Sequence, residues 1–543
     1  GEGTPSQPVS PPVHTQPIPA EYLPPDDALP RIVNSDYPPY LNVCVELIDG
    51  ALGRGWGELP AFYCDGQPFS FSQLSRRVNR LANGFKGLGV GLGDRVMLRM
   101  DDGPDLVACM MALFRIGAVA IPTYTLFRAA DLVYRANDSE AMGMVAHPDL
   151  LPEVEEARPS CPTWRWLVHD LDELAVGQSE QCEPANTGRD DIAMILYTSG
   201  ATSDPKGVIQ THAEHFANTD RCLSCFLPLE TGDVLAGPMA LPFAFGVNWV
   251  MTAVLRTGSA SVLFPKKTPA LLLEAVDRHK VKVLAAVPTF YNMMLQLLEG
   301  GQRFDLSSLR WCFSGGEPLP MAVCERWKAA TGLDIWQALG ATELHGFMTG
   351  MRAAGLRLET CGQAIDGYRI AVRDPDSFAE LPPGQAGAFT CLGPSGARYW
   401  RKPELQRKMV RDGWTIVNDV VTMDQDGYVT HIARSDDVIV SGGYNISPSH
   451  VERVIGHHPA VHEVAVVGAP DPTGQRPAIV KAYVVTRPGF SPSEQLVSDI
   501  QGFVRDRTAP YMYPRAVEFL AELPKTPNGK VRRTELKQAA WQT

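Results

Sequence analysis

The chain lacks both a basic surplus and a long apolar run, and each absence excludes a class of function. Its 543 residues include 61 acidic and 49 basic side chains, for a formal net charge of −12. Because nucleic-acid binding normally needs a basic face, we expect no nucleic acid as a main partner. The most hydrophobic stretch, Leu106 to Phe114, stops at Arg115 and is too short for a membrane span. An anionic ligand would need a local positive site.

A disulfide framework is also missing, since the eleven cysteines are scattered along the chain. This usage is typical of a reducing compartment, and we expect a cytoplasmic protein. Cys222 and Cys225 form one CxxC pair, but no second pair completes a zinc site. His212 and His215 are too close for the HExxH zinc motif and are predicted to be ordinary histidines on a helix surface.

The two common glycine-rich nucleotide motifs are absent as well. The run from Gly87 to Gly93 lacks the dinucleotide spacing and is interpreted as a turn that leads into a strand predicted at Arg95–Arg99. The segment from Ile195 to Val208 is not a Walker loop, because Lys206 follows a proline.

What this segment does contain is an apolar strand followed by hydroxyls, a small residue and one cation. Its polar and small members are Thr198, Ser199, Gly200, Thr202, Ser203 and Lys206. Such a set can wrap a polyphosphate with backbone N–H groups, hydroxyls and a positive charge. A polar surface loop is the alternative.

The length of the chain predicts at least two domains. Residues 1–25 carry eight prolines without apolar periodicity, and we expect a disordered arm there rather than a signal peptide. Strands then alternate with helices, which is typical of a parallel sheet covered on both faces. The acidic, proline-containing segment between Pro148 and Asp191 is expected to be irregular, and shorter β-rich pieces begin near Gly384. The predicted fold is α/β, with a large N-terminal domain (26–434) of mixed, mostly parallel sheets wrapped by helices and a small mobile α+β C-terminal domain (435–543).

Three predicted strands end in glycine and polar residues. The first leads into the segment at Thr198, the second into Gly315-Gly316-Glu317-Pro318, and the third into Gly340-Ala-Thr-Glu343. Ligands of open α/β sheets bind outside the carboxyl ends of the strands. The convergence of three such ends therefore predicts a binding site outside the carboxyl ends of these strands.

With these motifs in this order, the chain resembles the adenylate-forming superfamily of acyl-CoA synthetases, adenylation domains and luciferases, from about Leu41 to Arg533. The segment Tyr197–Gly207 resembles the family's phosphate loop, with Ala201 and Ser203 as departures. The resemblance implies ATP or AMP contacts from a set of loop and strand-end residues. They are Thr198, Ser199, Gly200, Thr202, Lys206, Gly315, Gly316, Glu317, Pro318, Gly340, Asp419 and Arg434.

The resemblance also implies catalytic roles and two half-reactions, adenylation of a carboxylic acid and then transfer to a thiol. Thr342 would meet the α-phosphate, Glu343 would help to hold Mg²⁺, and Lys530 would serve adenylation. From the residues alone, Lys530 would be expected to be an exposed lysine in a turn. Asp436 matches the hinge of the small domain, and Gly442 and Gly443 match a pantetheine tunnel. ATP, Mg²⁺ and coenzyme A are the implied cofactors, and a homodimer is left open.

Within the superfamily, the chain is most similar to benzoate- and 2-aminobenzoate-CoA ligases. Phe243, Ala244 and Phe245 would then line a flat apolar pocket, although ordinary core packing is the alternative. His345 and Gly346 would also face the substrate. Those ligases have a histidine at the position of Gly346, so a glycine there could deepen the pocket. A medium-chain fatty acid, loading of a carrier protein, and a catalytically silent nucleotide-binding homologue are the alternatives.

Overall fold

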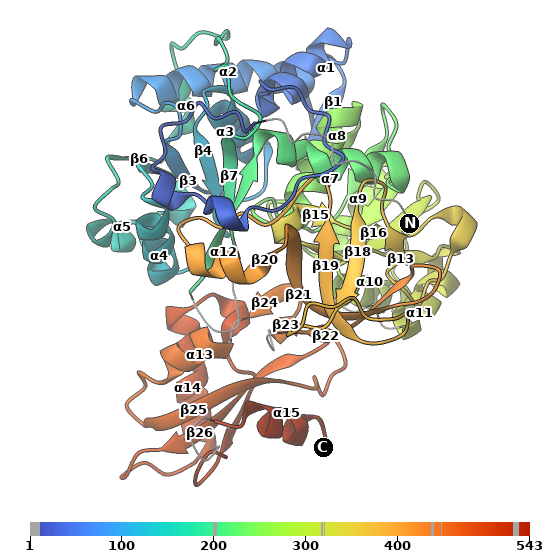
Figure 1. Cartoon of the computed structure of the whole chain (residues 1–543). Helices are drawn as coiled ribbons and strands as arrows, with labels where there is room; N and C mark the ends of the chain where they lie inside the picture. The colour runs from blue at the N-terminus through green and yellow to red at the C-terminus, as the bar shows by residue number, and fades with distance from the viewer. Residues whose placement is uncertain are drawn as a thin grey trace.

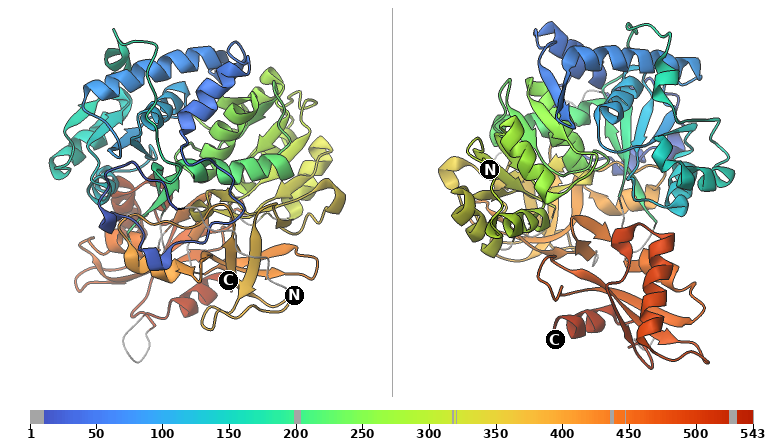
Figure 2. Two further views of the ribbon diagram at one scale, coloured as in Figure 1. Left: turned by 45° about the horizontal axis from the view of Figure 1, so that its top comes forward. Right: turned by 180° about the vertical axis from the view of Figure 1, so that it is seen from behind.

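The computed structural model describes residues 11–198, 204–316, 319, 321–435, 439–446, 448–524 and 531–542. Two largely parallel sheets and one antiparallel sheet make up the upper part of the molecule (Figure 1). The remaining strands and helices, from β23 onward, form a separate lobe at the bottom, which is clearest from behind (Figure 2). The predicted combination of a large α/β domain with a small α+β domain is confirmed.

The first sheet has six strands in the order β6-β5-β3-β4-β7-β8, all parallel except for the last pair. Its strands are almost wholly buried, as expected for a sheet covered on both faces. Their bounds are β3 (Arg95–Arg99), β4 (Val119–Pro122), β5 (Gly143–Ala146), β6 (Trp166–Val168), β7 (Ile192–Thr198) and β8 (Lys206–Thr211).

The second sheet has seven strands in the order β13-β12-β11-β9-β10-β1-β2, and only the β1–β2 hairpin is antiparallel. The carboxyl ends of its parallel strands, β12 and β13 among them, therefore lie at one edge, whereas β7, the third strand predicted to end in such residues, belongs to the first sheet. Its strands are β1 (Pro60–Cys64), β2 (Gln67–Ser70), β9 (Val234–Ala236), β10 (Ala260–Leu263), β11 (Val283–Ala285), β12 (Trp311–Ser314) and β13 (Ile335–Gln337).

Helices cover both sheets, and their starts follow local sequence rules. In α2 (Phe71–Gly87), Ser70 and Gln73 form a reciprocal cap. Proline occupies the first turn of α3 (Pro104–Arg115), where its missing N–H costs nothing. Helix α3 is buried from Leu106 to Arg115 within the main core. Other helices include α4 (Ala129–Ser139), α7 (His212–Cys225), α9 (Pro269–His279), α10 (Pro288–Glu299), α11 (Met321–Thr331) and α12 (Pro403–Met409).

The antiparallel sheet and the small lobe complete the chain. The antiparallel sheet joins β18 (Arg369–Arg373), β19 (Gly387–Leu392), β20 (Val410–Arg411), β21 (Trp414–Met423) and β22 (Val429–Arg434). The small lobe has two cores of its own, built from residue 439 onward. It contains β23 (Ile439–Ser441), β24 (Tyr444–Ile446), β25 (Val461–Ala469), β26 (Ile479–Thr486), β27 (Ala516–Phe519), α13 (Pro448–Ile455), α14 (Glu494–Arg507) and α15 (Arg533–Trp541).

The prediction of a disordered arm over residues 1–25 is wrong for residues 11–25. The backbone N–H of Thr15 donates to Oδ1 of Asp191 at 2.7 Å, and its hydroxyl donates to Oδ2 at 2.5 Å. The side-chain amide of Gln16 donates to the carbonyl of Ile192 at 2.7 Å. Polar contacts with the start of β7 and the packing of Ile18, Tyr22 and Leu23 against the core hold this segment, without the regular apolar spacing of a helix or strand.

Two other expectations are corrected. His212 and His215 are fully buried rather than on a helix surface, because α7 is covered along most of its circumference. The segment between Pro148 and Asp191, expected to be irregular, contains β6 and two short helices, α5 (Leu151–Ala157) and α6 (Leu171–Ala175). All eleven cysteines lie in described residues, and none forms a disulfide. In the part of the chain that the structure describes, no helix is long and apolar enough to cross a bilayer.

Candidate active site

A cavity of about 660 Å³ lies where the carboxyl ends of strands from both largely parallel sheets meet the antiparallel sheet and the small lobe. Its lining falls into three groups, from strand ends, from β21–β22 and from the small lobe. The cavity brings together residues separated by more than 300 positions in sequence, from Tyr124 to Arg515. The strand-end convergence expected from the sequence therefore forms one continuous cavity.

Asp419 and His431 mark one end of this cavity. The two residues lie on the paired strands β21 and β22, and Nε2 of His431 is 2.6 Å from Oδ1 of the buried Asp419. Asp419 also pairs in register with Arg434, whose side chain lies outside the description. Val417 and Asn418 continue this wall. His431 was missed by the sequence analysis, although its place on the strand opposite Asp419 is the signal that could have found it.

The central wall carries Thr198, Lys206, Thr342 and Glu343. Thr198 and Lys206 are register partners on β7 and β8, so the intervening loop starts and ends at the same place. Lys206 is largely buried, with its ammonium 5.8 Å from the ring centre of Tyr399. The Tyr399 hydroxyl donates to Oε1 of Glu343 at 3.4 Å. A cation and a carboxylate thus face the same space.

The predicted glycines do not all face this space. Gly316 and Gly340 line the cavity, and Gly316 has a positive φ of 86°. A Cβ on Gly315 would instead lie 2.5 Å from the ring of Phe347, so packing explains the absence of a side chain there. Contact of Gly315 with a ligand is therefore not supported. Ser199, Gly200, Thr202, Glu317 and Pro318 lie outside the described residues.

Aromatic and aliphatic side chains form the next part of the cavity. Phe243, Ala244 and Phe245 all line it. The rings of Phe245 and Phe347 meet edge to face, with centroids 4.9 Å apart. Further apolar lining comes from the strand ends and α10, namely Met239, Val287, Phe290, Met293 and Leu339. This region can hold a flat apolar group by the shape and edge-to-face geometry of its rings.

The placement of His345 in this pocket is wrong. Its side chain is buried against Glu214, with Nε2 3.0 Å from Oε2, and is not among the described residues that line the cavity. Glu214 also accepts from Nε of Arg398 at 2.6 Å. Burial would raise the pKa of Glu214, but the Arg398 charge and the His345 hydrogen bond outweigh it and hold that pKa at about 2. His345 therefore belongs to a buried hydrogen-bonded network around Glu214.

Gly346 does line the cavity, but it does not deepen the pocket. A Cβ at this position would lie 2.2 Å from Oδ1 of Asn218 and 2.9 Å from Nδ2 of Asn248. The amide of Asn218 is held in place, since it donates to the carbonyl of Phe347 at 2.7 Å and accepts from its N–H at 3.1 Å. The space left by the missing side chain is thus filled by two asparagines.

The small lobe closes the remaining side of the cavity with its β23–β24 hairpin. Ser441, Gly442, Gly443 and Tyr444 all line the cavity. Gly442 and Gly443 have φ values of 59° and 85°, a region that favours glycine. Arg476 and Arg515 line the cavity from the same lobe. Asp436 and Lys530, the predicted hinge and catalytic lysine, lie outside the described residues.

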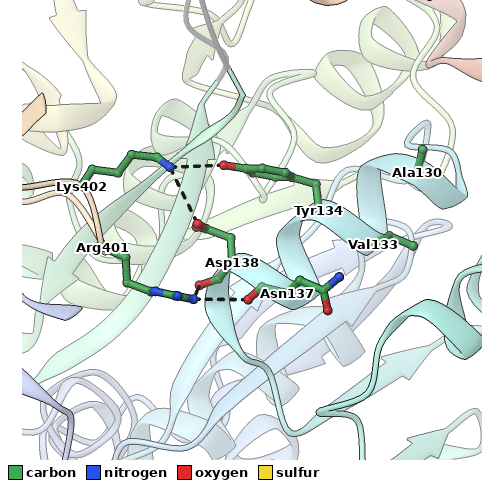
Figure 3. Close-up of a pocket in the computed structure, with 7 residues that line it drawn as sticks. All are labelled: Ala130, Val133, Tyr134, Asn137, Asp138, Arg401 and Lys402. Atoms are coloured by element: carbon green, nitrogen blue, oxygen red, sulfur yellow. Dashed lines mark hydrogen bonds and ion pairs between the residues drawn. The ribbon is translucent and has the colours of Figure 1, made fainter. Parts of the chain in front are cut away.

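A second, open pocket of about 750 Å³ lies on the surface between α4 and the segment after Trp400 (Figure 3). The two cationic side chains of this pocket both contact residues of α4. Arg401 donates to the carbonyl of Asp138 at 3.0 Å, and Nζ of Lys402 lies 3.3 Å from the hydroxyl of Tyr134 and 3.8 Å from Oδ1 of Asp138. These contacts brace the end of α4 against the antiparallel part of the protein.

Comparison with known proteins identifies the family to which the chain belongs. The AMP-binding enzyme family matches residues 52–400, and its C-terminal domain matches residues 450–530. Benzoate–CoA ligase of Thauera aromatica is 33% identical over 513 residues, covering 92% of this chain and 97% of that protein.

Two solved structures are similar over nearly the whole chain. The anthranilate CoA ligase AuaEII, in complex with anthranoyl-AMP, has a TM-score of 0.72 and 31% identity, and the match covers 93% of this chain and 98% of that chain. A benzoate CoA ligase from Burkholderia xenovorans has a TM-score of 0.68 and 30% identity, with coverage of 91% and 99%. The chain therefore belongs to the AMP-binding enzyme family, the adenylate-forming superfamily, and is one of its AMP-forming acid–CoA ligases.

Proposed function

We propose that the enzyme activates an aromatic carboxylic acid with ATP and transfers the acyl group to coenzyme A. The observation that carries this proposal is the composition of one cavity. The cavity brings together the carboxylate of Asp419 on a pair of strands, the ammonium of Lys206 with the carboxylate of Glu343, and the aromatic rings of Phe243 and Phe245. The relatives named for benzoate and anthranilate support an aromatic acid.

In the first half-reaction, an oxygen of the acid attacks the α-phosphorus of ATP, and the bond to pyrophosphate breaks. Negative charge crowds this transition state, so positive groups and fixed donors directed at it supply most of the catalysis. We assign Thr342 to the α-phosphate, Lys206 to the outer phosphates, and Asp419 and Arg434 to the ribose hydroxyls. Ser199, Gly200, Thr202, Glu317 and Pro318 would add contacts from outside the described residues, and Lys530 would bridge the acid and the phosphate.

A magnesium ion is proposed to accompany the nucleotide. In nucleotide sites Mg²⁺ is usually held by one or two carboxylates and the substrate phosphates. Glu343 fits this pattern, because it is partly buried on the cavity wall beside Lys206 and receives the Tyr399 hydroxyl on one oxygen. The described ranges contain no group of three or more His, Cys, Asp or Glu side chains that could hold a metal. The ion would neutralise phosphate charge when bound.

In the second half-reaction, a thiol attacks the acyl carbonyl, and AMP leaves. We place the thiol beside Gly442 and Gly443, since a backbone without side chains leaves room for a narrow chain. A rotation of residues 435–543 about Asp436 would exchange Lys530 for this hairpin between the two steps. A homodimer remains a prediction, to be checked by sedimentation.

A panel of carboxylic acids tests the function. Pyrophosphate release is measured with benzoate, 2-aminobenzoate and a medium-chain fatty acid, each with and without coenzyme A. We expect release with the aromatic acids and thioester formation when coenzyme A is added. Preference for the fatty acid would contradict the aromatic assignment. Acyl transfer only to a carrier protein would contradict free coenzyme A, and no release with any acid would indicate a silent homologue.

A further inference from the structure

Three tyrosines from two domains meet at the cavity. Tyr124 follows β4 in the large domain, Tyr444 begins β24 in the small lobe, and Tyr511 lies in a short 3-10 helix of the same lobe. The rings of Tyr444 and Tyr511 are stacked, with centroids 4.0 Å apart and planes at 5°. The ring of Tyr124 lies 5.5 Å from Tyr444 and 5.9 Å from Tyr511, and the hydroxyls of Tyr124 and Tyr444 share a hydrogen bond.

The hydroxyl pair is neutral under ordinary conditions. Burial is the main cause that raises the pKa of Tyr124, and the nearby Tyr444 raises it further. Burial likewise raises the pKa of Tyr444. One phenol therefore donates to the other at all working pH values, and no ionised phenolate is buried between the domains. The hydrogen bond is specific to one domain arrangement, because the two hydroxyls meet only when the domains have one relative position.

The same loop of the large domain makes a second contact with the small lobe. Arg128, four residues after Tyr124, donates through Nε to the carbonyl of Thr508 at 3.0 Å and through Nη2 to that of Arg505 at 3.1 Å. These carbonyls lie at the C-terminus of α14, where a cation is favourable for the exposed carbonyl groups and the helix dipole. Residues 124–128 thus hold both the hairpin and the end of α14.

We propose that Tyr124 and Arg128 are positioning residues for the thioester-forming half-reaction alone. They hold the small lobe where Ser441, Gly442, Gly443 and Tyr444 face the cavity, and so stabilise one of the two domain arrangements. The inference rests on the proposed function, in which the other arrangement serves adenylation. A contact present in one arrangement shifts the equilibrium by its own free energy and leaves the chemistry of the other arrangement unchanged.

The hydroxyl bond is tested by Tyr124→Phe, Tyr444→Phe and the double variant in the full-length protein. The single variants should slow thioester formation from supplied acyl-adenylate and coenzyme A roughly three- to tenfold, the range for one lost hydrogen bond. Pyrophosphate release without coenzyme A should slow by less than thioester formation does. Because the two hydroxyls share one bond, the double variant should be no slower than either single variant.

Arg128→Gln is an independent test that leaves the tyrosines intact, and it should act on the same half-reaction. Tyr37→Phe is the matched control, since it removes a hydroxyl bonded to Asp220 at 2.6 Å within the large domain. Equal slowing of both half-reactions, additive tyrosine effects, or no loss in any variant would overturn the proposal.

Small-angle scattering of the unliganded chain separates this inference from the proposed function. The wild type should fit the described arrangement, and the variant with both Tyr124→Phe and Arg128→Gln should show a shifted or broadened distribution of domain positions. This readout needs no substrate, so a wild type that activates no acid would refute the function and leave the domain test intact. Identical scattering from the two proteins would refute the positioning role.

Discussion

Nε2 of His345 lies 3.0 Å from Oε2 of Glu214, and both side chains are buried. Glu214 belongs to α7, whereas His345 directly follows the short helix that carries Thr342 and Glu343. Arg398, 2.6 Å from the other oxygen of Glu214, adds a third segment to this network. The network therefore holds the Thr342–Glu343 turn in position on the cavity wall, although the network itself contributes no group to the cavity.

Glu214→Ala should destabilise the fold by about 3–5 kcal/mol, because it leaves Arg398 and His345 without their buried partner. Denaturant unfolding followed by fluorescence measures this loss. Glu404→Ala is the matched control, since that carboxylate is almost fully exposed and its ion pair with Arg407 lies at the surface. The control should change stability by no more than about 0.5 kcal/mol. Similar small effects from both substitutions would show that the buried network does not stabilise the turn.

Acid should destabilise the protein from below about pH 6.5, through His212 and His215. Burial lowers the pKa of His212 to about 4 and that of His215 to about 3 from an ordinary value of 6.5. Both are neutral in the folded state at pH 5, whereas the unfolded chain takes up protons. Stability therefore falls as the pH is lowered, by up to about 1.4 kcal/mol per pH unit for each histidine.

Unfolding midpoints at several pH values between 7.5 and 5 measure this slope. His215→Gln should reduce it by about half, because His215 then no longer titrates on unfolding. His147→Gln changes an exposed histidine and serves as the control. A slope that is the same in wild type and His215→Gln would contradict the assignment.

Gly346→Ala should destabilise the protein by about 3 kcal/mol or more, from backbone strain and a clash with Asn218. The φ of Gly346 is +145°, and the added Cβ would meet an asparagine that is held by two hydrogen bonds. Gly427→Ala is a matched control with a φ of +86° and open space around the new Cβ. It should lose only the strain, about 1–2 kcal/mol. Equal losses in denaturant unfolding would show that the asparagines yield to the methyl group.

Lys530→Ala should suppress adenylate formation by roughly 10²- to 10³-fold, the scale for one group that stabilises a charged transition state. Thioester formation from supplied acyl-adenylate should be spared. Pyrophosphate release and single-turnover thioester formation measure the two steps separately. Lys537→Ala, on α15, is the matched lysine control. Equal loss of both steps in the Lys530 variant would contradict this division between the half-reactions.

Strand patterns and strand-end chemistry carried most of the sequence-based prediction. The predicted strand Arg95–Arg99 matches β3, because a short apolar run between a turn and a helix can form little other than a buried strand. The cavity at the strand ends followed from the parallel topology. The direction of His345 did not, since it depends on a left-handed φ of 65° that local sequence does not reveal. The buried positions of His212 and His215 depend on packing from distant segments, which periodicity within α7 cannot show.

The attachment of residues 11–25 has a consequence for handling the protein. Thr15 and Gln16 hold this segment against Asp191 and Ile192, at the start of β7, the strand that ends at Thr198 on the cavity wall. A variant that starts after Pro25 would leave the Asp191 carboxylate with fewer hydrogen-bond donors and would release the start of that strand. Deleting this proline-rich segment to aid crystallisation should therefore weaken ATP binding, an effect on a site at a distance from the deletion.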